Sequence, residues 1–260
     1  MARTIYDKPT RLLLNDMIAA WSLKPGEVFT SGRAIDWFAG KYPKLRPGSI
    51  RAHLVQAATN DQSRLHHSPS EADDLFFKVG PSQFRLYEPG KDPAPIREKF
   101  AGDVAQQEAT EPEQGTEDAE ARPGSSQFLW EKDLQQYLSR NLEILEPGLR
   151  LYEEDNLKGI EFDAGGRFID LLAVDKTGAL VVIELKVSKG YDRVVGQLLR
   201  YVNYVRRELA APGQRVRGII ICRNMTEDLR LACASIPDVE LYEYQLSVTV
   251  QRVEALPLPK

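Results

Sequence analysis

The chain has 260 residues, of which 42% are hydrophobic, so it is long enough to bury one large core or two modest ones. Its two cysteines, Cys222 and Cys233, lack metal-ligand spacing and are too few for a disulfide framework, so we expect reduced core residues. No apolar run approaches the roughly 18 residues that a membrane helix needs, and residues 1–9 lack a signal-peptide pattern. We therefore expect a cytoplasmic protein.

The net charge of −4 is unevenly distributed along the chain. Residues 1–90 hold 12 Lys and Arg against 9 Asp and Glu, residues 91–126 hold 4 against 9, and residues 127–260 hold 18 against 20. The middle segment is rich in Pro, Gly, Glu, Gln and Ala, and cannot bury enough apolar surface to offset its ordering entropy. We predict one domain over 1–90, a flexible acidic linker over 91–126 and a second domain over 127–260.

The first 90 residues predict three helices followed by a hairpin. Apolar residues recur at helical spacing over 10–21, and Thr30 or Ser31 can cap a second helix that stops at Tyr42. Pro47 opens a third helix, after which two apolar runs flank a Gly-Pro-Ser-Gln turn. This order is the plan of a winged-helix domain.

The third helix carries a polar stripe opposite its apolar residues, which suits a recognition helix in a DNA major groove. The stripe recurs at i, i+4, i+7 and i+11 and consists of Ser49, His53, Gln56 and Asn60. The basic residues that could contact DNA with it are Arg46 and Arg51 near the helix start and Lys78 and Arg85 on the hairpin. The alternative is a winged helix that contacts protein, because a net charge of +3 (12 minus 9) is weak for DNA binding.

The second half of the chain predicts an α/β domain with a mixed sheet flanked by helices. An amphipathic helix over 128–145 precedes strands over 168–174 and 179–187, which a turn of the Asp-to-Gly type joins. The remaining predicted elements are a long helix over 191–209, a buried strand over 216–222, a helix over 227–235 and strands over 239–244 and 246–253.

Three charged residues interrupt the two hydrophobic strands of that hairpin. Asp170 lies near the start of one strand and Glu184 near the end of the other, so the turn brings the two carboxylates side by side. Lys186 points the same way as Glu184, because side chains alternate along a strand. Buried charges are costly unless they are paired or bind a cation, and a few carboxylates suit Mg²⁺. The pattern favours a Mg²⁺ site, at which Mn²⁺ is expected to substitute; the alternative is a structural ion pair with Lys186.

The order of Asp170 and then Glu184-Leu185-Lys186 resembles the PD-(D/E)XK nuclease superfamily. More narrowly, GRFIDLLAVDKTGALVVIELK followed by GQLLRYVNYV resembles the catalytic domain of the NucS mismatch endonucleases and of related uncharacterised nucleases, over about residues 127–250. The resemblance implies a restriction-endonuclease-like fold, with Asp170 and Glu184 as metal ligands and Lys186 as the catalytic lysine. Ile169 replaces the proline that names the superfamily. The first half does not resemble the N-terminal domain of NucS, so mismatch specificity does not carry over.

The resemblance extends to the two helices that flank these strands. Gln197 and Tyr201, one turn apart on the long helix, match active-site residues of the superfamily. Glu131, at the start of the first helix, matches the acidic residue that often completes the metal shell, and the alternative for it is solvent exposure. Arg193 and Arg200 share a stripe of the long helix with Gln197, which favours contacts with the DNA backbone over a merely solvated face.

These features predict a metal-dependent DNA endonuclease, targeted by a winged helix, of a restriction-like or phage-defence kind. Two alternatives stay open: a repair nuclease acting on mismatched or branched DNA, and a non-catalytic DNA-binding regulator that keeps the nuclease fold as a scaffold. DNA is the expected partner, and a homodimer is one arrangement consistent with cutting two strands.

Overall fold

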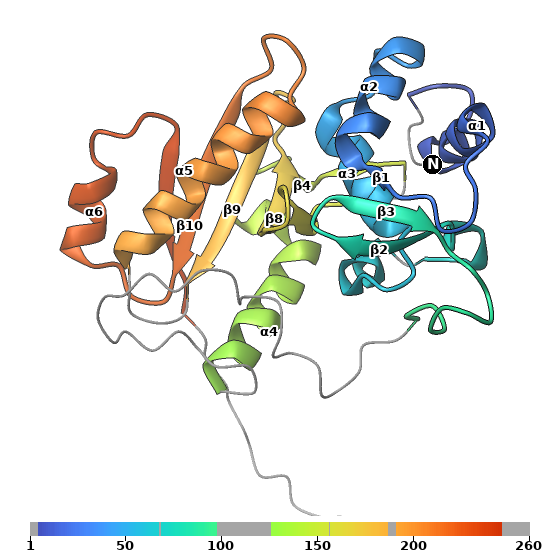
Figure 1. The fold of residues 1–260 in the computed structure, drawn as a ribbon. Helices are drawn as coiled ribbons and strands as arrows, with labels where there is room; N and C mark the ends of the chain where they lie inside the picture. The colour runs from blue at the N-terminus through green and yellow to red at the C-terminus, as the bar shows by residue number, and fades with distance from the viewer. Residues whose placement is uncertain (1–4, 68, 98–125, 156, 187–190, 246–260) are drawn as a thin grey trace, which may run out of the picture.

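The computed structural model describes residues 5–67, 69–97, 126–155, 157–186 and 191–245, which form two domains that lie side by side (Figure 1). Residues 98–125 of the linker predicted over 91–126, and the strand predicted over 246–253, lie outside the described residues. Residues 91–97, which we assigned to the linker, belong to the N-terminal domain. Asp92 pairs with Arg85 there, and the backbone amide of Ile96 donates to the carbonyl of Thr59 at 2.9 Å.

The N-terminal domain has the predicted winged-helix order. Its elements are α1 (Thr10–Trp21), α2 (Ser31–Lys41), α3 (Pro47–Gln56), the 3-10 helices η1 (Gln62–His67) and η2 (Glu71–Asp73), β2 (Phe76–Gly80) and β3 (Gln83–Leu86). Thr30 caps α2 as predicted, because its hydroxyl accepts a hydrogen bond from the Arg33 amide at 3.2 Å. The sequence did not indicate β1 (Phe29–Thr30), which pairs with β3 and completes a three-stranded sheet of order β1-β3-β2.

The C-terminal domain is built on a mixed sheet, as predicted. Its elements are α4 (Ser126–Arg140), η3 (Leu142–Ile144), β4 (Arg150–Leu151), β5 (Glu153–Glu154), β6 (Leu157–Lys158), β7 (Ile160–Asp163), β8 (Phe168–Val174), β9 (Leu180–Lys186), α5 (Tyr191–Glu208), β10 (Val216–Cys222), α6 (Glu227–Cys233) and β11 (Val239–Glu243). The sheet has the order β11-β10-β9-β8-β4, and β7 also pairs with β8. β8 and β9 are antiparallel, whereas β9, β10 and β11 run parallel. The short strands from β4 to β7 were not predicted, and α4 ends five residues before the predicted end at 145.

Helices cover both faces of this sheet (Figure 1). α5 and α6 pack on one face through Val194, Leu198 and Leu229, and α4 packs on the other through Leu134 and Leu138. Burying these apolar side chains contributes about 1.5 to 3 kcal/mol for each large one. A mixed sheet between two helical layers is the restriction-endonuclease-like architecture expected from the sequence.

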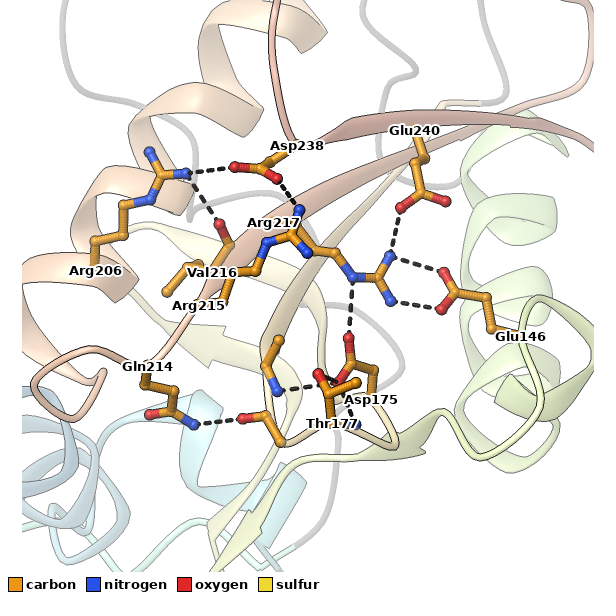
Figure 2. Close-up of polar contacts among 12 residues, drawn as sticks. Glu146, Asp175, Thr177, Arg206, Gln214, Arg215, Val216, Arg217, Asp238 and Glu240 are labelled. Atoms are coloured by element: carbon orange, nitrogen blue, oxygen red, sulfur yellow. Dashed lines mark hydrogen bonds and ion pairs between the residues drawn. The ribbon is translucent and has the colours of Figure 1, made fainter.

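A buried arginine at the start of β10 joins the sheet to the loops around it (Figure 2). Arg217 donates two hydrogen bonds to Glu146, at 2.7 and 2.6 Å, and one each to Asp175 (3.2 Å) and Glu240 (2.8 Å). Asp175 begins the turn between β8 and β9, so the network fixes that turn. It lies at the opposite end of β9 from Glu184, because Arg217 is paired with the second residue of that strand.

Both cysteines are buried and free, as predicted. No helix in the described part of the chain combines the length and the apolar composition that crossing a membrane requires.

Candidate functional site

Asp170 and Glu184 meet where β8 and β9 separate. Main-chain pairing of the two strands stops after Leu171, and the Asp170 carboxylate then accepts the Leu185 amide at 2.7 Å. In return, the Asp170 backbone amide donates to the Glu184 carboxylate. α4 holds the same point from the other face, because Gln135 Nε2 donates to the Asp170 carbonyl at 3.0 Å. The structure therefore brings together the two carboxylates that the hairpin pattern predicted.

The surroundings of this carboxylate pair disfavour its negative charge. Burial raises the pKa of Asp170 to about 7 and raises the pKa of Glu184 well above its ordinary value. The charge of Asp170 raises the pKa of Glu184 further, whereas Lys186 lowers both. Glu184 is only 2% exposed, and its Oε1 atom has no hydrogen-bond partner. A buried carboxylate oxygen without a partner is costly, and either a proton or a bound cation would offset that cost.

α5 adds two of the predicted side chains. Gln197 Nε2 donates to the Tyr201 hydroxyl at 3.5 Å. Burial raises the pKa of Tyr201 to about 12, and the charge of Glu184 adds to the shift, so the phenol stays protonated and can donate a hydrogen bond. The exposed Arg167 lowers this pKa, which places a guanidinium within electrostatic range of the site.

Glu131 lies near the pair without completing a ligand set. Its charge raises the pKa of both Asp170 and Glu184. Within the described ranges, however, no three His, Cys, Asp or Glu side chains gather closely enough to hold a metal ion. Mg²⁺ usually retains several waters and needs only one or two carboxylates. The carboxylate pair, with the partnerless Glu184 Oε1, therefore fits a divalent cation, but the structure does not supply Glu131 as a third ligand.

The predicted recognition helix is covered by the C-terminal domain. Ser49, His53 and Gln56 are 0%, 1% and 4% exposed. α3 contacts α5, β6 and β7, and Ala52 belongs to the apolar core of the C-terminal domain. Gly48 lies so close to α5 that an added Cβ would approach the Glu208 carbonyl to 3.1 Å. The expectation of an exposed, groove-reading face is therefore wrong, because helical periodicity identifies a polar face without showing what covers it.

Polar contacts hold the two domains together around α3. The amide and hydroxyl of Thr10 both donate to Asp155 Oδ2, at 3.1 and 2.6 Å. Arg51, expected at DNA, instead pairs with Glu208 of α5 at 2.5 Å. These partners belong to segments more than 140 residues apart in the chain, so the contact depends on tertiary structure alone.

His53 is a buried titratable group of this interface, only 1% exposed. Burial lowers its pKa to about 4, although Asp155 and Asp73 act in the opposite direction. Its Nδ1 atom lies 3.2 Å from Gln56 Oε1, and its Nε2 atom has no hydrogen-bond partner. His53 is therefore neutral at pH 7 and cannot contact a phosphate.

Asn60, Lys78 and Arg85, which were also predicted to contact DNA, make internal contacts instead. The Asn60 side chain bonds to the backbone of Lys78, whose ammonium group pairs with Asp61 at 2.7 Å. Arg85 holds both carboxylate oxygens of Asp92. Arg46 is half-buried at the N-terminus of α3.

Arg193 and Arg200 on α5 remain exposed and compatible with the prediction of contacts with the DNA backbone. The sequence reasoning missed Arg167 and Glu161, both in the hairpin of β7 and β8. A signal for that hairpin was present: Asp163 Oδ1 accepts the amide of Gly165 at 3.0 Å, and Gly165 and Gly166 both have positive φ.

A hairpin that places an aspartate beside a Glu-x-Lys strand, inside a mixed sheet covered by helices on both faces, defines a PD-(D/E)XK nuclease domain. The family model for the endonuclease NucS C-terminal domain matches residues 130–236, and a domain family of unknown function, DUF7669, matches residues 9–86. The second half of the chain is therefore a NucS-like nuclease domain.

Curated relatives of this half carry the name endonuclease NucS. The protein from Methanopyrus kandleri is 31% identical over 105 residues, which are 40% of this chain and 37% of the relative. The protein from Corynebacterium jeikeium is 33% identical over 122 residues, 44% of this chain and 46% of the relative. A solved repair endonuclease from Pyrococcus abyssi aligns over 50% of each chain, with 25% identity and a TM-score of 0.38. The chain thus spans less than half the length of these two curated relatives.

Proposed function

We propose that the protein is a metal-dependent DNA endonuclease that acts in DNA repair, on mismatched or branched DNA. The observation that carries the proposal is the pair of buried carboxylates, Asp170 and Glu184, with a partnerless oxygen and Lys186 beside it. The relatives share the name endonuclease NucS, and the resemblance of the second half to the NucS mismatch endonucleases favours the repair alternative over the restriction-like or phage-defence function that we first expected.

Hydrolysis of a phosphodiester requires a polarised phosphate, an attacking water and stabilisation of the charge that develops. A Mg²⁺ or Mn²⁺ ion held by Asp170 and Glu184 would supply Lewis acidity and a lowered pKa for water. Lys186 supplies positive charge beside the carboxylates and stabilises the developing phosphate charge. The Tyr201 hydroxyl accepts a hydrogen bond from Gln197 and is protonated at neutral pH, so it can donate one to a group bound at the same place.

DNA would approach the end of the sheet rather than α3. Arg167, Arg193 and Arg200 are exposed on the hairpin and helix that flank the site, where guanidinium groups can bind phosphates. The winged helix then serves to extend and rigidify the nuclease domain, because its groove-reading helix is occupied.

The test is cleavage of labelled DNA by the full chain with Mg²⁺ or Mn²⁺. Asp170→Ala and Glu184→Ala should each reduce the rate at least about 10³-fold, whereas Glu143→Ala, which changes an exposed carboxylate on η3, should not. Mismatched, flapped and perfectly paired duplexes in one panel separate the functions: equal cutting of perfect duplexes would favour the restriction-like reading. Activity that survives both alanine substitutions would reject the site.

A further inference from the structure

Glu161, on β7, lies directly opposite Asp170. Ile160 pairs with Leu171 and Phe162 with Ile169, so the antiparallel register leaves Glu161 across from Asp170. Asp170 therefore has a carboxylate on the neighbouring strand at each side, Glu161 on β7 and Glu184 on β9.

Both strands break the alternation of side chains at this paired position. Residues two apart on a strand should share a face. On β7, however, Ile160 packs against the core under α4, whereas Phe162 belongs to the core under α5. On β8, Leu171 likewise lies under α4 and Ile169 under α5. The switch occurs at Glu161 and at Asp170, so both side chains leave the regular faces of the sheet at the same level.

The backbone of Glu161 supports a functional reason for this irregularity. Its φ of 44° lies in the left-handed region, which is unfavourable for a residue with a side chain. Such conformations persist where the surrounding structure imposes them, and they concentrate at functional sites. The charge of Glu161 also raises the pKa of Asp170, which places the carboxylate within electrostatic range of the pair.

Among the described residues Glu161, like Glu131, does not gather with Asp170 and Glu184 into a three-carboxylate ligand set. We propose that Glu161 is a positioning residue of the cation site, which acts through the water shell of the ion beside Asp170. The inference deepens the proposed function and rests on it. The buried Glu184, with its partnerless Oε1, is an independent observation that fits a cation at this place. Glu161 differs from Glu131 in lying on a strand that is hydrogen-bonded to β8, so its position relative to Asp170 is fixed by the sheet.

The test is calorimetric titration of the full chain with Mn²⁺ alone, without DNA. Glu161→Gln removes the charge and keeps the shape, and it should weaken Mn²⁺ binding about tenfold, as expected for a group that supports metal ligands. Unchanged Mn²⁺ affinity in Glu161→Gln would overturn the inference. Circular dichroism of both proteins without metal establishes that the fold is retained.

A second variant separates metal binding from backbone strain. Glu161→Gly relieves the positive φ, so it should raise the unfolding temperature of the metal-free protein while losing Mn²⁺ affinity to the same extent as Glu161→Gln. A glycine variant that gains stability and keeps wild-type Mn²⁺ affinity would show that position 161 is only a strained turn, and would overturn the inference.

Asp170→Asn, titrated in parallel, distinguishes failure of this inference from failure of the proposed function. Wild-type binding that is lost in Asp170→Asn but kept in Glu161→Gln rejects Glu161 alone. A wild-type protein that binds no Mn²⁺ rejects the metal site as a whole, and Glu161 with it.

Discussion

The polar stripe of α3 and the charged pair at the end of β8 and β9 were both predicted as functional from their periodicity, but the stripe is covered by the other domain, whereas the pair keeps the features of a candidate site. On α3, Ser49 and His53 are covered by the other domain and carry no charge at neutral pH. At the strand ends, Asp170 and Glu184 lie where main-chain pairing of β8 and β9 stops, and the Asp170 carboxylate accepts the Leu185 amide there. The difference teaches that polar residues in an apolar element indicate a ligand site only when neighbouring protein groups leave their charge or hydrogen-bonding capacity uncompensated.

The largest expected effect separates activity from stability at the carboxylate pair. Glu184→Gln and Asp170→Asn should abolish cleavage but stabilise the metal-free fold by about 1 to 3 kcal/mol above pH 7, because the folded state disfavours these charges. Since the pKa of Asp170 is raised to about 7, the destabilisation by its charge appears as pH rises toward 7. The gain in Asp170→Asn should therefore fade as pH falls through 7 toward 4. Urea unfolding with EDTA at pH 8 and pH 4.5 measures it, and a loss of stability at pH 8 would contradict the electrostatic account.

The interface of α3 predicts the opposite pattern, in which stability changes without activity. Arg51→Ala removes the interdomain partner of Glu208, which keeps only the exposed Arg207, and should destabilise the protein by about 1 to 3 kcal/mol. The dependence of DNA affinity on salt should stay the same, because Arg51 is not available to phosphates. If Arg51→Ala instead reduced the salt dependence of DNA affinity by the equivalent of one phosphate contact, α3 would have to contact DNA. Arg200→Ala, an exposed position on α5, is the matched arginine that should reduce it.

A pH-dependent effect is expected at His53. Its folded pKa of about 4 is below its unfolded value, so the unfolded chain binds more protons between these values. The stability that the neutral His53 contributes is complete above about pH 6.5 and is lost as pH falls toward 4, by about 2 to 3 kcal/mol. In His53→Gln this component should vanish. The difference in unfolding free energy between the two proteins at pH 7.5 and pH 4.5 measures it, and a constant difference would place His53 in a solvated setting.

The smallest effect serves as a control for the N-terminal domain. Thr30→Ala removes the N-cap of α2 and should cost about 1 kcal/mol. It touches neither α3 nor the carboxylate pair, so cleavage and the pH dependence of stability should both be retained. A change in either property would mean that the interface responds to any loss of stability in this domain.

Local patterns were sufficient for most elements and for the centre of the site. The apolar run of β10 was predicted with its observed bounds, Val216–Cys222, because a strand buried on both faces has a continuous apolar sequence. Asp170 and Glu184 were found because charges inside such strands are conspicuous. Glu161 was missed because β7 is short and irregular, and its pairing with β8 is not encoded in its own sequence.

What the sequence could not provide was the contact between distant segments. The bond of Thr10 to Asp155 and the pairing of Arg51 with Glu208 depend on how two separately patterned domains meet. A hydrogen-bonding stripe on a helix suits a base edge and a protein partner equally, so periodicity alone did not distinguish them.

The most direct test of the central claim is anomalous diffraction from crystals of the full chain soaked in Mn²⁺. The account predicts an anomalous peak between the carboxylates of Asp170 and Glu184, at the point where β8 and β9 separate. The account would be contradicted if Mn²⁺ bound only elsewhere in such crystals, while the two carboxylates kept their hydrogen bonds to the backbone amides and no peak lay between them.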